Sequence, residues 1–465
     1  MSDDEGVLSP EPVITISFPQ AYTSENIGFR FWPSLQQWCS KMDISWYLED
    51  QLMAQIVAEP DSAEWMLEAP SVSFDKIEIV LMKTNLPGQF AKIQQIQIGQ
   101  IIVFMQNEIV RVSLLNEIDP SLCQLSVDTM TVQIRDRKGR NLIPKQDQAI
   151  HLYRDGVRIA SHYITDSQQD TRNSYTFQCQ SAIGRLEDDF LGGIYENEQL
   201  SVLLQEVLGT FPFTIDDSFS DTTVSGYLPV CTRREALQQI AFAIGAVVST
   251  QGSGVIRLNP LETEVSSAFE KRAVFSGAKV KREPQTASVR LFAHNYIKTE
   301  ETEYLLEEEE IHGEDVLFVF DDPHYDYDLY GNADLVASGA NWVKITANGY
   351  VSLNAKKYRH TVSVLAKENP LATAAEKSNS VTIDSATLVN AGNATKILER
   401  LYEFHNLKRV LEQDAVIGGQ HAGQLVDSIT PFGNRIVGYI TGMDNSFTSS
   451  GTVARVEIRG KEVDT

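Results

Sequence analysis

The spacing of apolar positions predicts a chain built mainly from β-strands. Residues 13–18, "VITISF", alternate apolar and polar side chains, which is typical of a strand with one buried face. The same period of two recurs in "KIQQIQIGQIIVF", "LSVDTMTVQIRD", "YRHTVSVLAK" and "TVARVEIRG". Asp155 and Gly156 stand between two alternating runs. This dipeptide supplies the positive φ angles of a two-residue loop, so the sequence predicts a β-hairpin here.

A period near 3.6 residues predicts three helices, and the second is the most completely specified. In "GYLPVCTRREALQQIAFAIGAVVSTQGSGVIRLNP", residues 226–260, Thr232 precedes Glu235 by the spacing of a capping box. Gly245 can adopt the left-handed conformation that ends a helix, and "AVVST" and "VIRLNP" follow as strands joined by "QGSG". The predicted apolar face consists of Ala236, Leu237, Ile240, Ala241 and Ile244.

The other two predicted helices lie on either side of that stretch in the sequence. The first has a single apolar stripe formed by Leu200, Leu203, Leu204, Val207 and Leu208. The third spans about 393–407, with Asn393 as its predicted N-cap. Its predicted inward side chains are Ile397, Leu398, Leu401 and Phe404.

These patterns divide the chain into four regions. The first region, 1–12, is predicted to be a flexible acidic tail, without the apolar core of a secretory signal. Region 13–183 is β-rich and contains an excursion at about 26–92, and 184–273 is a small α/β domain. Region 274–465 is β-rich again, with one helix at about 393–407.

Charge is the strongest compositional signal. The 465 residues carry a net charge of −24, which disfavours nucleic-acid binding because a phosphate backbone would be repelled. The excess is local, since residues 299–328 hold 13 acidic residues and no Lys or Arg. This segment is interpreted either as a solubilising face or as a surface that repels polyanions or meets a basic partner. The sequence contains no run of about 18 apolar residues, so it predicts no membrane-spanning helix.

Candidate chemistry is sparse. His324 lies among four aspartates in "DDPHYDYD", but the run follows an apolar strand and favours an Asp-Pro turn over a metal site. Ser253 lacks the GxSxG spacing of a nucleophilic serine, and no phosphate loop or HExxH pair occurs. The sequence therefore predicts no catalytic residue, no cofactor and no metal. Among 63 acidic residues, however, some two carboxylates could always lie across a cleft as the pair that glycoside hydrolysis requires.

The cysteines also favour a structural interpretation. They are separated by at least 50 residues, which predicts free thiols in a reducing compartment, acting as small buried hydrophobic side chains. The four are Cys39, Cys123, Cys179 and Cys231.

The most orderly stretch also carries a family resemblance. "SGYLPVCTRREALQQIAFAIGAVV", preceded by "YTFQCQSAIGRLEDDFLGGIY", resembles the tail hub proteins of phages and of phage-tail-like bacteriocins from Gram-positive bacteria. "KTNLPGQFAKIQQIQIG", "NEIDPSLCQLSVDTMTVQI" and "GNRIVGYITGMDNSFTSSGTVARVEIRG" extend this resemblance over most of 13–460.

The resemblance implies a fold with two tube-like β-barrel domains joined by the small α/β domain. It further implies a homotrimeric, non-enzymatic ring at the baseplate centre of a virion or tail-like particle, assembled in the host bacterial cytoplasm. Six barrels would let a sixfold tail tube protein above seat on a threefold central spike protein below, beside other baseplate (wedge) proteins. DNA would pass the lumen without specific binding, repelled by carboxylates, and no membrane would be involved.

Two alternatives stay open at this point. One is a tail-tip or distal-tail adaptor of a non-contractile phage, although the chain stops at Thr465 without the receptor-binding or lytic domains that many of those relatives carry. The other is a cell-wall hydrolase or carbohydrate-binding module, for which the sandwich-like strands of 69–93 within the excursion would be the candidate.

Overall fold

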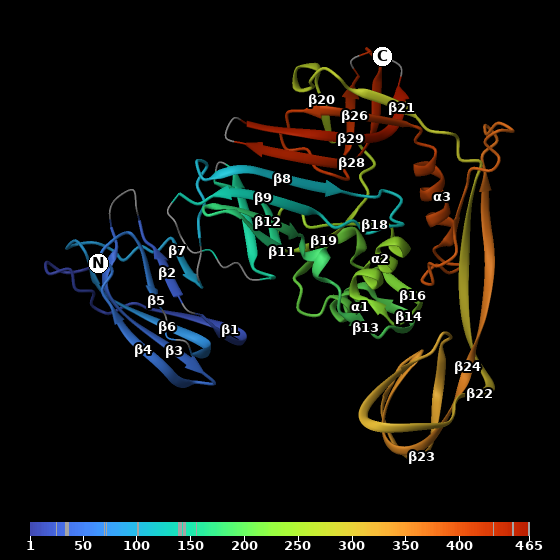
Figure 1. Ribbon diagram of the computed structural model, residues 1–465, viewed down its shortest axis with the longest axis horizontal. Helices are drawn as coiled ribbons and strands as arrows, with labels where there is room; N and C mark the ends of the chain where they lie inside the picture. Colours follow the sequence, from blue (N-terminus) through green and yellow to red (C-terminus); the bar gives the residue numbers. More distant parts are fainter. Residues whose placement is uncertain are drawn as a thin grey trace. The chain divides into compact units, whose positions relative to one another are not determined.

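A computed structural model describes the protein and is mainly β, which confirms the predicted fold class. The residues it describes are 1–24, 26–32, 37–68, 70, 72–99, 102–137, 142, 146–154, 156–430, 432–448 and 451–463. They form two compact units, Met1–Val103 and Phe104–Thr465 (Figure 1). The structure thus places a boundary inside the region predicted as 13–183, and 26–92 belongs to the first unit rather than interrupting a barrel.

The first unit is a sandwich of two antiparallel sheets, with strand orders β1-β6-β3-β4 and β5-β2-β7. Its core is formed by alternate residues of both sheets, including Trp46 and Phe74 from one and Phe29 from the other. The strands are β1 (Val13–Thr23), β2 (Asn26–Arg30), β3 (Cys39–Leu48), β4 (Gln51–Ala58), β5 (Glu64–Glu68), β6 (Ser73–Thr84) and β7 (Gln95–Ile98).

The prediction of a flexible tail at 1–12 is wrong. Ser2 and Leu8 are buried, and the backbone of Leu8 donates to the carbonyl of Met82 at 2.9 Å. Thr84 donates its own backbone N–H to the carbonyl of Gly6 at 2.8 Å. An apolar anchor at Leu8 and hydrogen bonds to β6 hold this segment, and its four acidic residues gave no sign of either.

The second unit is organised around a sheet of eleven strands in its described part, with the main order β10-β11-β12-β9-β8-β28-β29-β26-β21. β27 pairs with both β20 and β28 beside this path. One group of its strands comprises β8 (Ile109–Glu117), β9 (Thr129–Arg135), β10 (Ala149–Arg154), β11 (Val157–Thr171) and β12 (Ser174–Gln180). The other comprises β20 (Ser267–Phe269), β21 (Lys279–Arg282), β26 (Arg409–Ala415), β27 (Leu425–Ile429), β28 (Arg435–Thr448) and β29 (Gly451–Val463).

The predicted hairpin is confirmed, because Arg154 pairs with Val157 across a two-residue loop in which Gly156 has φ +80°. Asp155 lies outside the described residues. The two groups of strands are called here the first module (β8–β12) and the second module (β20, β21 and β26–β29).

A small α/β region lies between the modules in sequence and contains the first two predicted helices. Its helices are α1 (Leu200–Leu208) and α2 (Arg233–Ile244). Its strands are β13 (Asp189–Phe190), β14 (Gly193–Gln199), β15 (Phe213–Ile215), β16 (Thr223–Leu228), β17 (Cys231–Thr232), β18 (Ala246–Ser249) and β19 (Ile256–Pro260). The predicted stripe of α1 is fully buried, and that of α2 is buried except for the partly buried Ile244.

A long three-stranded arm projects from the second unit (Figure 1). It consists of β22 (Ser288–Val319), β23 (His324–Ser338) and β24 (Trp342–Glu368), with the short β25 (Ser380–Ile383) beside β22. The third helix, α3 (Ala394–His405), packs against β22 and β24 near their shared base. Among the described residues, no helix is both long and apolar enough to cross a membrane.

Candidate functional site

β28 joins the two modules into one sheet. Its first half, from Arg435 to Tyr439, pairs with β27, and its second half, from Gly442 to Phe447, pairs with β8. Along nearly its whole length the other edge of β28 pairs with β29. Backbone hydrogen bonding therefore makes the modules one continuous surface.

The face of the first module opposite its core is polar and carries charges of both signs, including the exposed Arg111 and Arg135 and, at the junction with β28, Asp444. Thr131 donates its hydroxyl to the side-chain carbonyl of Gln178 at 2.7 Å, between neighbouring strands. At the junction, Ser113 donates its hydroxyl to a carboxylate oxygen of Asp444 at 2.8 Å. Pairing and burial place on this face Ser113, Thr129, Thr131, Gln133, Thr176, Gln178 and Ser446.

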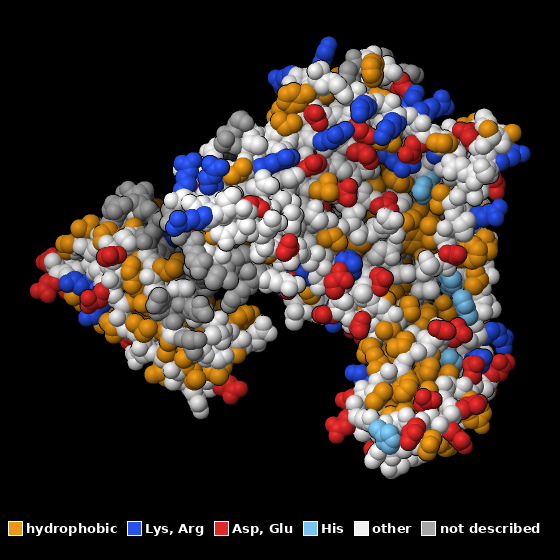
Figure 2. Space-filling model, viewed as in Figure 1, with side chains coloured by type: hydrophobic (Ala, Val, Ile, Leu, Met, Phe, Trp, Pro, Cys, Tyr) orange, Lys and Arg blue, Asp and Glu red, His pale blue; other side chains and the backbone are white. Residues whose placement is uncertain are grey.

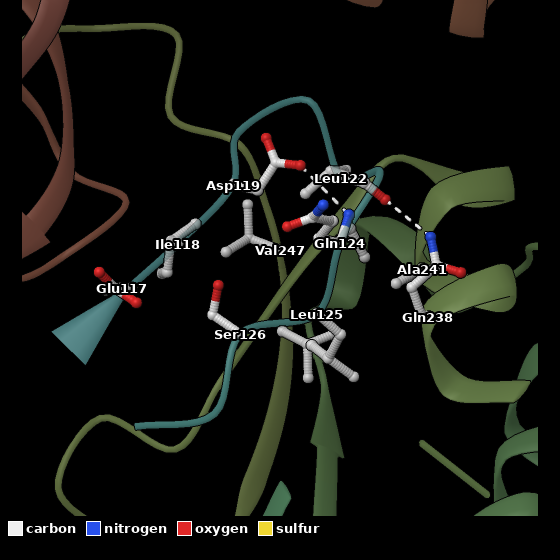
Figure 3. A pocket seen from close by; sticks show the side chains of 12 residues that line it. Glu117, Ile118, Asp119, Leu122, Gln124, Leu125, Ser126, Gln238, Ala241 and Val247 are labelled. Carbon is white, nitrogen blue, oxygen red and sulfur yellow. Dashed lines mark hydrogen bonds between the residues drawn. The ribbon is translucent and has the colours of Figure 1, made fainter. Parts of the chain in front are cut away.

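The stretch 226–260 forms a scaffold. Thr232 and Glu235 make the predicted capping box, in which the Thr232 backbone donates to the Glu235 carboxylate at 2.9 Å. The nearby cavity of about 20 Å³ has room for little more than a water molecule (Figure 3). The side-chain amide of Gln238 at its edge donates to the carbonyls of Leu122 and Cys123, both at 3.1 Å. The side-chain amide of Gln238 therefore holds the loop that contains Leu122 and Cys123 on α2.

The same stretch anchors the base of the arm. Gly226 has φ +138°, and an added Cβ there would lie 2.8 Å from the carbonyl oxygen of Thr387. The amide of Asn390 donates to the carbonyl of Ser225 at 2.8 Å. Tyr227 packs edge-on against Tyr296 of β22, with ring centroids 5.3 Å apart. This segment thus holds α3 and the base of the arm in place.

A histidine pair at the arm base had no signal in the sequence. His294 and His360 stand 66 positions apart, but β22 and β24 bring their ring nitrogens Nδ1 and Nε2 to 2.9 Å. Tyr296 stacks on His360 with centroids 4.5 Å apart. Burial of the ring has the largest effect in lowering the pKa of His294, and the neighbouring His360 lowers it further. The two rings pack as part of the junction between the arm and β16.

Gly245 ends α2 as predicted, with φ +81°. An added Cβ would lie 2.7 Å from a guanidinium nitrogen of Arg400, which is the movable end of a long side chain. Gly245→Val should lower the free energy of unfolding by about 1–3 kcal/mol, because a β-branched residue is strained at positive φ. Chemical denaturation would measure this loss. Gly245→Asn adds the same Cβ but tolerates this φ, so equal losses in the two variants would contradict the backbone explanation.

The acidic segment lies on the arm. Only some of its carboxylates are neutralised: Lys356 contacts Glu300 and Asp326 at 3.0 Å each, and Lys357 contacts Glu303 at 2.8 Å. The hydrogen bond from Lys357 is the largest cause that lowers the pKa of Glu303. Figure 2 shows acidic side chains over the far end of the arm.

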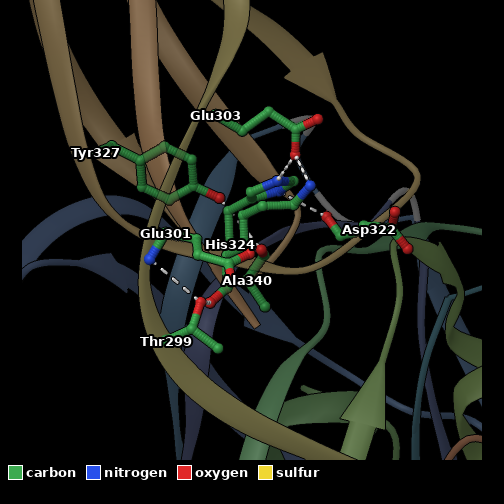
Figure 4. Close-up of polar contacts among 8 residues, drawn as sticks. Thr299, Glu301, Glu303, Asp322, His324, Tyr327 and Ala340 are labelled. Carbon is green, nitrogen blue, oxygen red and sulfur yellow. Dashed lines mark hydrogen bonds and ion pairs between the residues drawn. The ribbon is translucent and has the colours of Figure 1, made fainter. Parts of the chain in front are cut away.

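His324 belongs to a turn network (Figure 4). Its Nε2 lies 3.3 Å from a carboxylate oxygen of Glu303, and its Nδ1 lies 2.9 Å from the carbonyl of Asp322. Within the described ranges, no three His, Cys, Asp or Glu side chains gather as a metal site would require. The geometry therefore favours the Asp-Pro turn.

The other candidate nucleophiles have structural partners. Ser253 donates its hydroxyl to the carbonyl of Thr250 at 2.8 Å, inside the loop between β18 and β19. The four cysteines are free thiols. Burial raises the pKa of Cys231 to about 11 and that of Cys179 to about 12, so both stay neutral near pH 7. Neither has the thiolate character of a nucleophile.

The side chain of the predicted N-cap of α3 makes different hydrogen bonds from those of a capping residue. Asn393 is the N-cap residue of α3, but its side chain makes no capping hydrogen bond. Its carbonyl oxygen instead accepts from the backbone of Asn390 at 2.9 Å, and its amide donates to the carbonyl of Leu388 at 3.0 Å. The preceding turn, which also contacts β16, competes successfully for this side chain.

No protein-family model matches this chain, and no curated protein matches it by sequence. Its fold is similar to that of a 43 kDa tail protein of prophage MuSo2 from Shewanella oneidensis, at 11% identity and a TM-score of 0.46, over 78% of this chain and 95% of that one. It is also similar to a tail protein from Neisseria meningitidis MC58, at 10% identity and a TM-score of 0.46, over 76% and 93%. A third similar structure is prophage tail protein gp18 from Listeria monocytogenes EGD-e, at 10% identity and a TM-score of 0.44, over 79% and 92%.

Proposed function

We propose that three copies of this chain form the hub ring of a tail-like particle, which adapts a sixfold tube to a threefold spike. The observation that carries this proposal is the junction at β28, where one polypeptide supplies two β modules in a single sheet. Three such chains present six modules, so a trimer can match a sixfold partner. The resemblance of 226–248 to tail hub proteins gives the same assignment from an independent feature of the sequence.

The proposed partners are the tail tube protein on one side of the ring and the central spike protein on the other, with wedge proteins around it. The ring would lie at the baseplate centre of a virion or a bacteriocin particle and be assembled in the bacterial cytoplasm. Closure of the modules into barrels is part of this proposal. Among the described strands, β10 and β21, which end the large sheet on either side, do not pair with each other.

The lining of such a ring differs from the one that the net charge suggested. The acidic segment lies on β22 and β23, whereas the open face of the first module carries hydroxyl and amide groups together with Arg111 and Arg135. The carboxylates of Glu117 and Asp444 on the same face would offset these two cations, so a channel lined by this face would offer DNA no excess of positive charge. Neutral polar groups and balanced charges, rather than an excess of carboxylates, would make the surface non-adhesive.

The mass of the purified protein in solution tests the proposal. A trimer of about 156 kDa, three times the 51.9 kDa chain, is the expected result in analytical ultracentrifugation. A hexamer would instead favour a distal-tail adaptor of a non-contractile phage. A lytic band on a cell-wall zymogram that disappears on mutation of one carboxylate would contradict the non-enzymatic assignment.

A further inference from the structure

Four side-chain rings form a ladder that joins the arm to the α/β region. The rings of Tyr296 and His360 stack with centroids 4.5 Å apart, and those of His294 and His360 with centroids 5.1 Å apart. Tyr227 of β16 ends the ladder, edge-on against Tyr296. Beside it, the backbone N–H of His294 donates to the carbonyl of Val389 at 2.7 Å. The ring ladder is thus a place where β22 is fastened to the rest of the second unit.

The two histidines of the ladder share a hydrogen bond that needs one proton between them. Nδ1 of His294 and Nε2 of His360 lie 2.9 Å apart, so one of these nitrogens donates its N–H and the other accepts. This bond exists when both rings are neutral or when one of them is charged. When both rings are charged, each nitrogen carries a proton, no acceptor remains, and two like charges stand side by side.

Burial opposes a proton on the second ring. His294 is 7% exposed, whereas His360 is exposed, so water can solvate a charge on His360 but not one on His294. Burial and the neighbouring His360 accordingly lower the pKa of His294. A histidine released from this site would regain an ordinary pKa of about 6.5. Release therefore takes up a proton, so acidification below that value favours release and a higher pH favours the closed ladder.

The neighbouring groups do not reverse this direction. Asp384 favours a proton on His294, but less strongly than burial and His360 oppose it. Burial raises the pKa of Tyr227 and that of Tyr296, the latter to about 12, so both phenols stay neutral. α3 covers the opposite face of the arm base, to which strand alternation also directs Arg359. The titratable groups around the ladder, taken from each element beside it, are Glu196, Tyr227, Cys231, Tyr296, Asp322, Tyr327, Tyr358 and Asp384.

We propose that the ring ladder is an acid-sensitive latch, which holds β22 against β16 at neutral pH and releases it when both histidines are protonated. On the opposite face, Val289, Leu291 and Ala293 pack with the leucines of α3 and contain no titratable group. These contacts keep the base of the arm attached after release. The latch therefore changes how the arm is held beyond Ala293 and leaves the fold intact. It lies within one chain, so it is independent of the proposed ring.

Hydrogen exchange at about pH 7.5 and about pH 5, corrected for the intrinsic exchange rate at each pH, tests the latch. In wild type, the amides of 224–228 and 292–298 should lose at least about tenfold in protection at the lower pH, which is the effect of one pKa unit. The amides of α2 should keep their protection. His294→Phe retains a ring in the ladder but cannot be protonated, so its protection should be the same at both pH values.

His312→Phe is the matched control, because His312 is an exposed histidine on the far part of β22. This variant should respond to pH as wild type does. In His360→Gln, the amide can accept as well as donate, so a proton on His294 no longer breaks the bond and the loss of protection should be smaller than in wild type. Circular dichroism checks that each variant is folded.

Two results would overturn the latch. One is a wild-type protein in which these amides are equally protected at both pH values. The other is a loss at low pH that remains as large as in wild type in both His294→Phe and His360→Gln, because the histidine pair would then not be its cause.

Discussion

Leu237→Ala should lower the free energy of unfolding by about 2–5 kcal/mol. Leu237 is fully buried in α2, within the core that α1, α2 and strands β18 and β19 share. Removing three carbon atoms there forfeits their transfer free energy and leaves a cavity that a helix held at both ends cannot close. The loss would be measured by urea denaturation, as a lower midpoint with an unchanged slope.

Leu371→Ala is the control for this change, because it removes the same atoms from a side chain that is 78% exposed. Its effect should remain within about 0.5 kcal/mol. If the two variants were equally stable, the assignment of the inner face of α2 would be wrong. A loss in Leu237→Ala that comes with a changed slope would point to the unfolded state instead.

Gly438→Ala should cost about 3 kcal/mol, the upper end of the range for overpacking. Gly438 faces Gly460 across β28 and β29, and an added Cβ would lie 2.3 Å from the carbonyl oxygen of Arg459 and 2.5 Å from the Cα of Gly460. Both obstacles are backbone, so the two strands must separate. Because β28 also carries the junction between the modules, thermal unfolding should begin at a lower temperature.

Gly442→Ala on the same strand provides the comparison. Its added Cβ would meet its nearest neighbour, the Cβ of Glu457, at 3.9 Å, which is an ordinary contact. The unfolding free energy of this variant should stay within about 0.5 kcal/mol of wild type. Equal losses in both variants would show that alanine is unfavourable anywhere in β28 and that close approach of the strands is not the cause.

Local features of this fold follow from the sequence because their causes are local. The capping box of Thr232 and Glu235 and the turn at Gly245 depend on residues within one or two helical turns. The buried stripe of α1 repeats with the helical period, and the hairpin of β10 and β11 needs only its two-residue loop. These elements were predicted with nearly correct bounds.

Other features of the fold depend on partners that are distant in the sequence. Asp444 of β28 lies opposite Leu115 of β8, more than 300 residues earlier, and no local pattern selects that pairing. The same holds for His294 and His360, which meet only because β22 and β24 are in register.

The acidic segment shows how composition can mislead about position. The sequence leaves two interpretations open for residues 299–328, a solubilising face or a surface that repels polyanions or meets a basic partner, and it does not place them in the fold. The structure puts it on strands that bend back on their own apolar core, formed by Ile311, Val351 and Leu353 among others. Carboxylates there keep the outer face of the arm solvated.

Electron microscopy of the purified assembly would observe the central feature directly. If three subunits each place two β lobes around one axis, averaged end-on views will contain six lobes whose alternate members differ, giving threefold rather than true sixfold symmetry. Six equivalent lobes from six polypeptides, or a ring in which each subunit contributes a single lobe, would contradict the account.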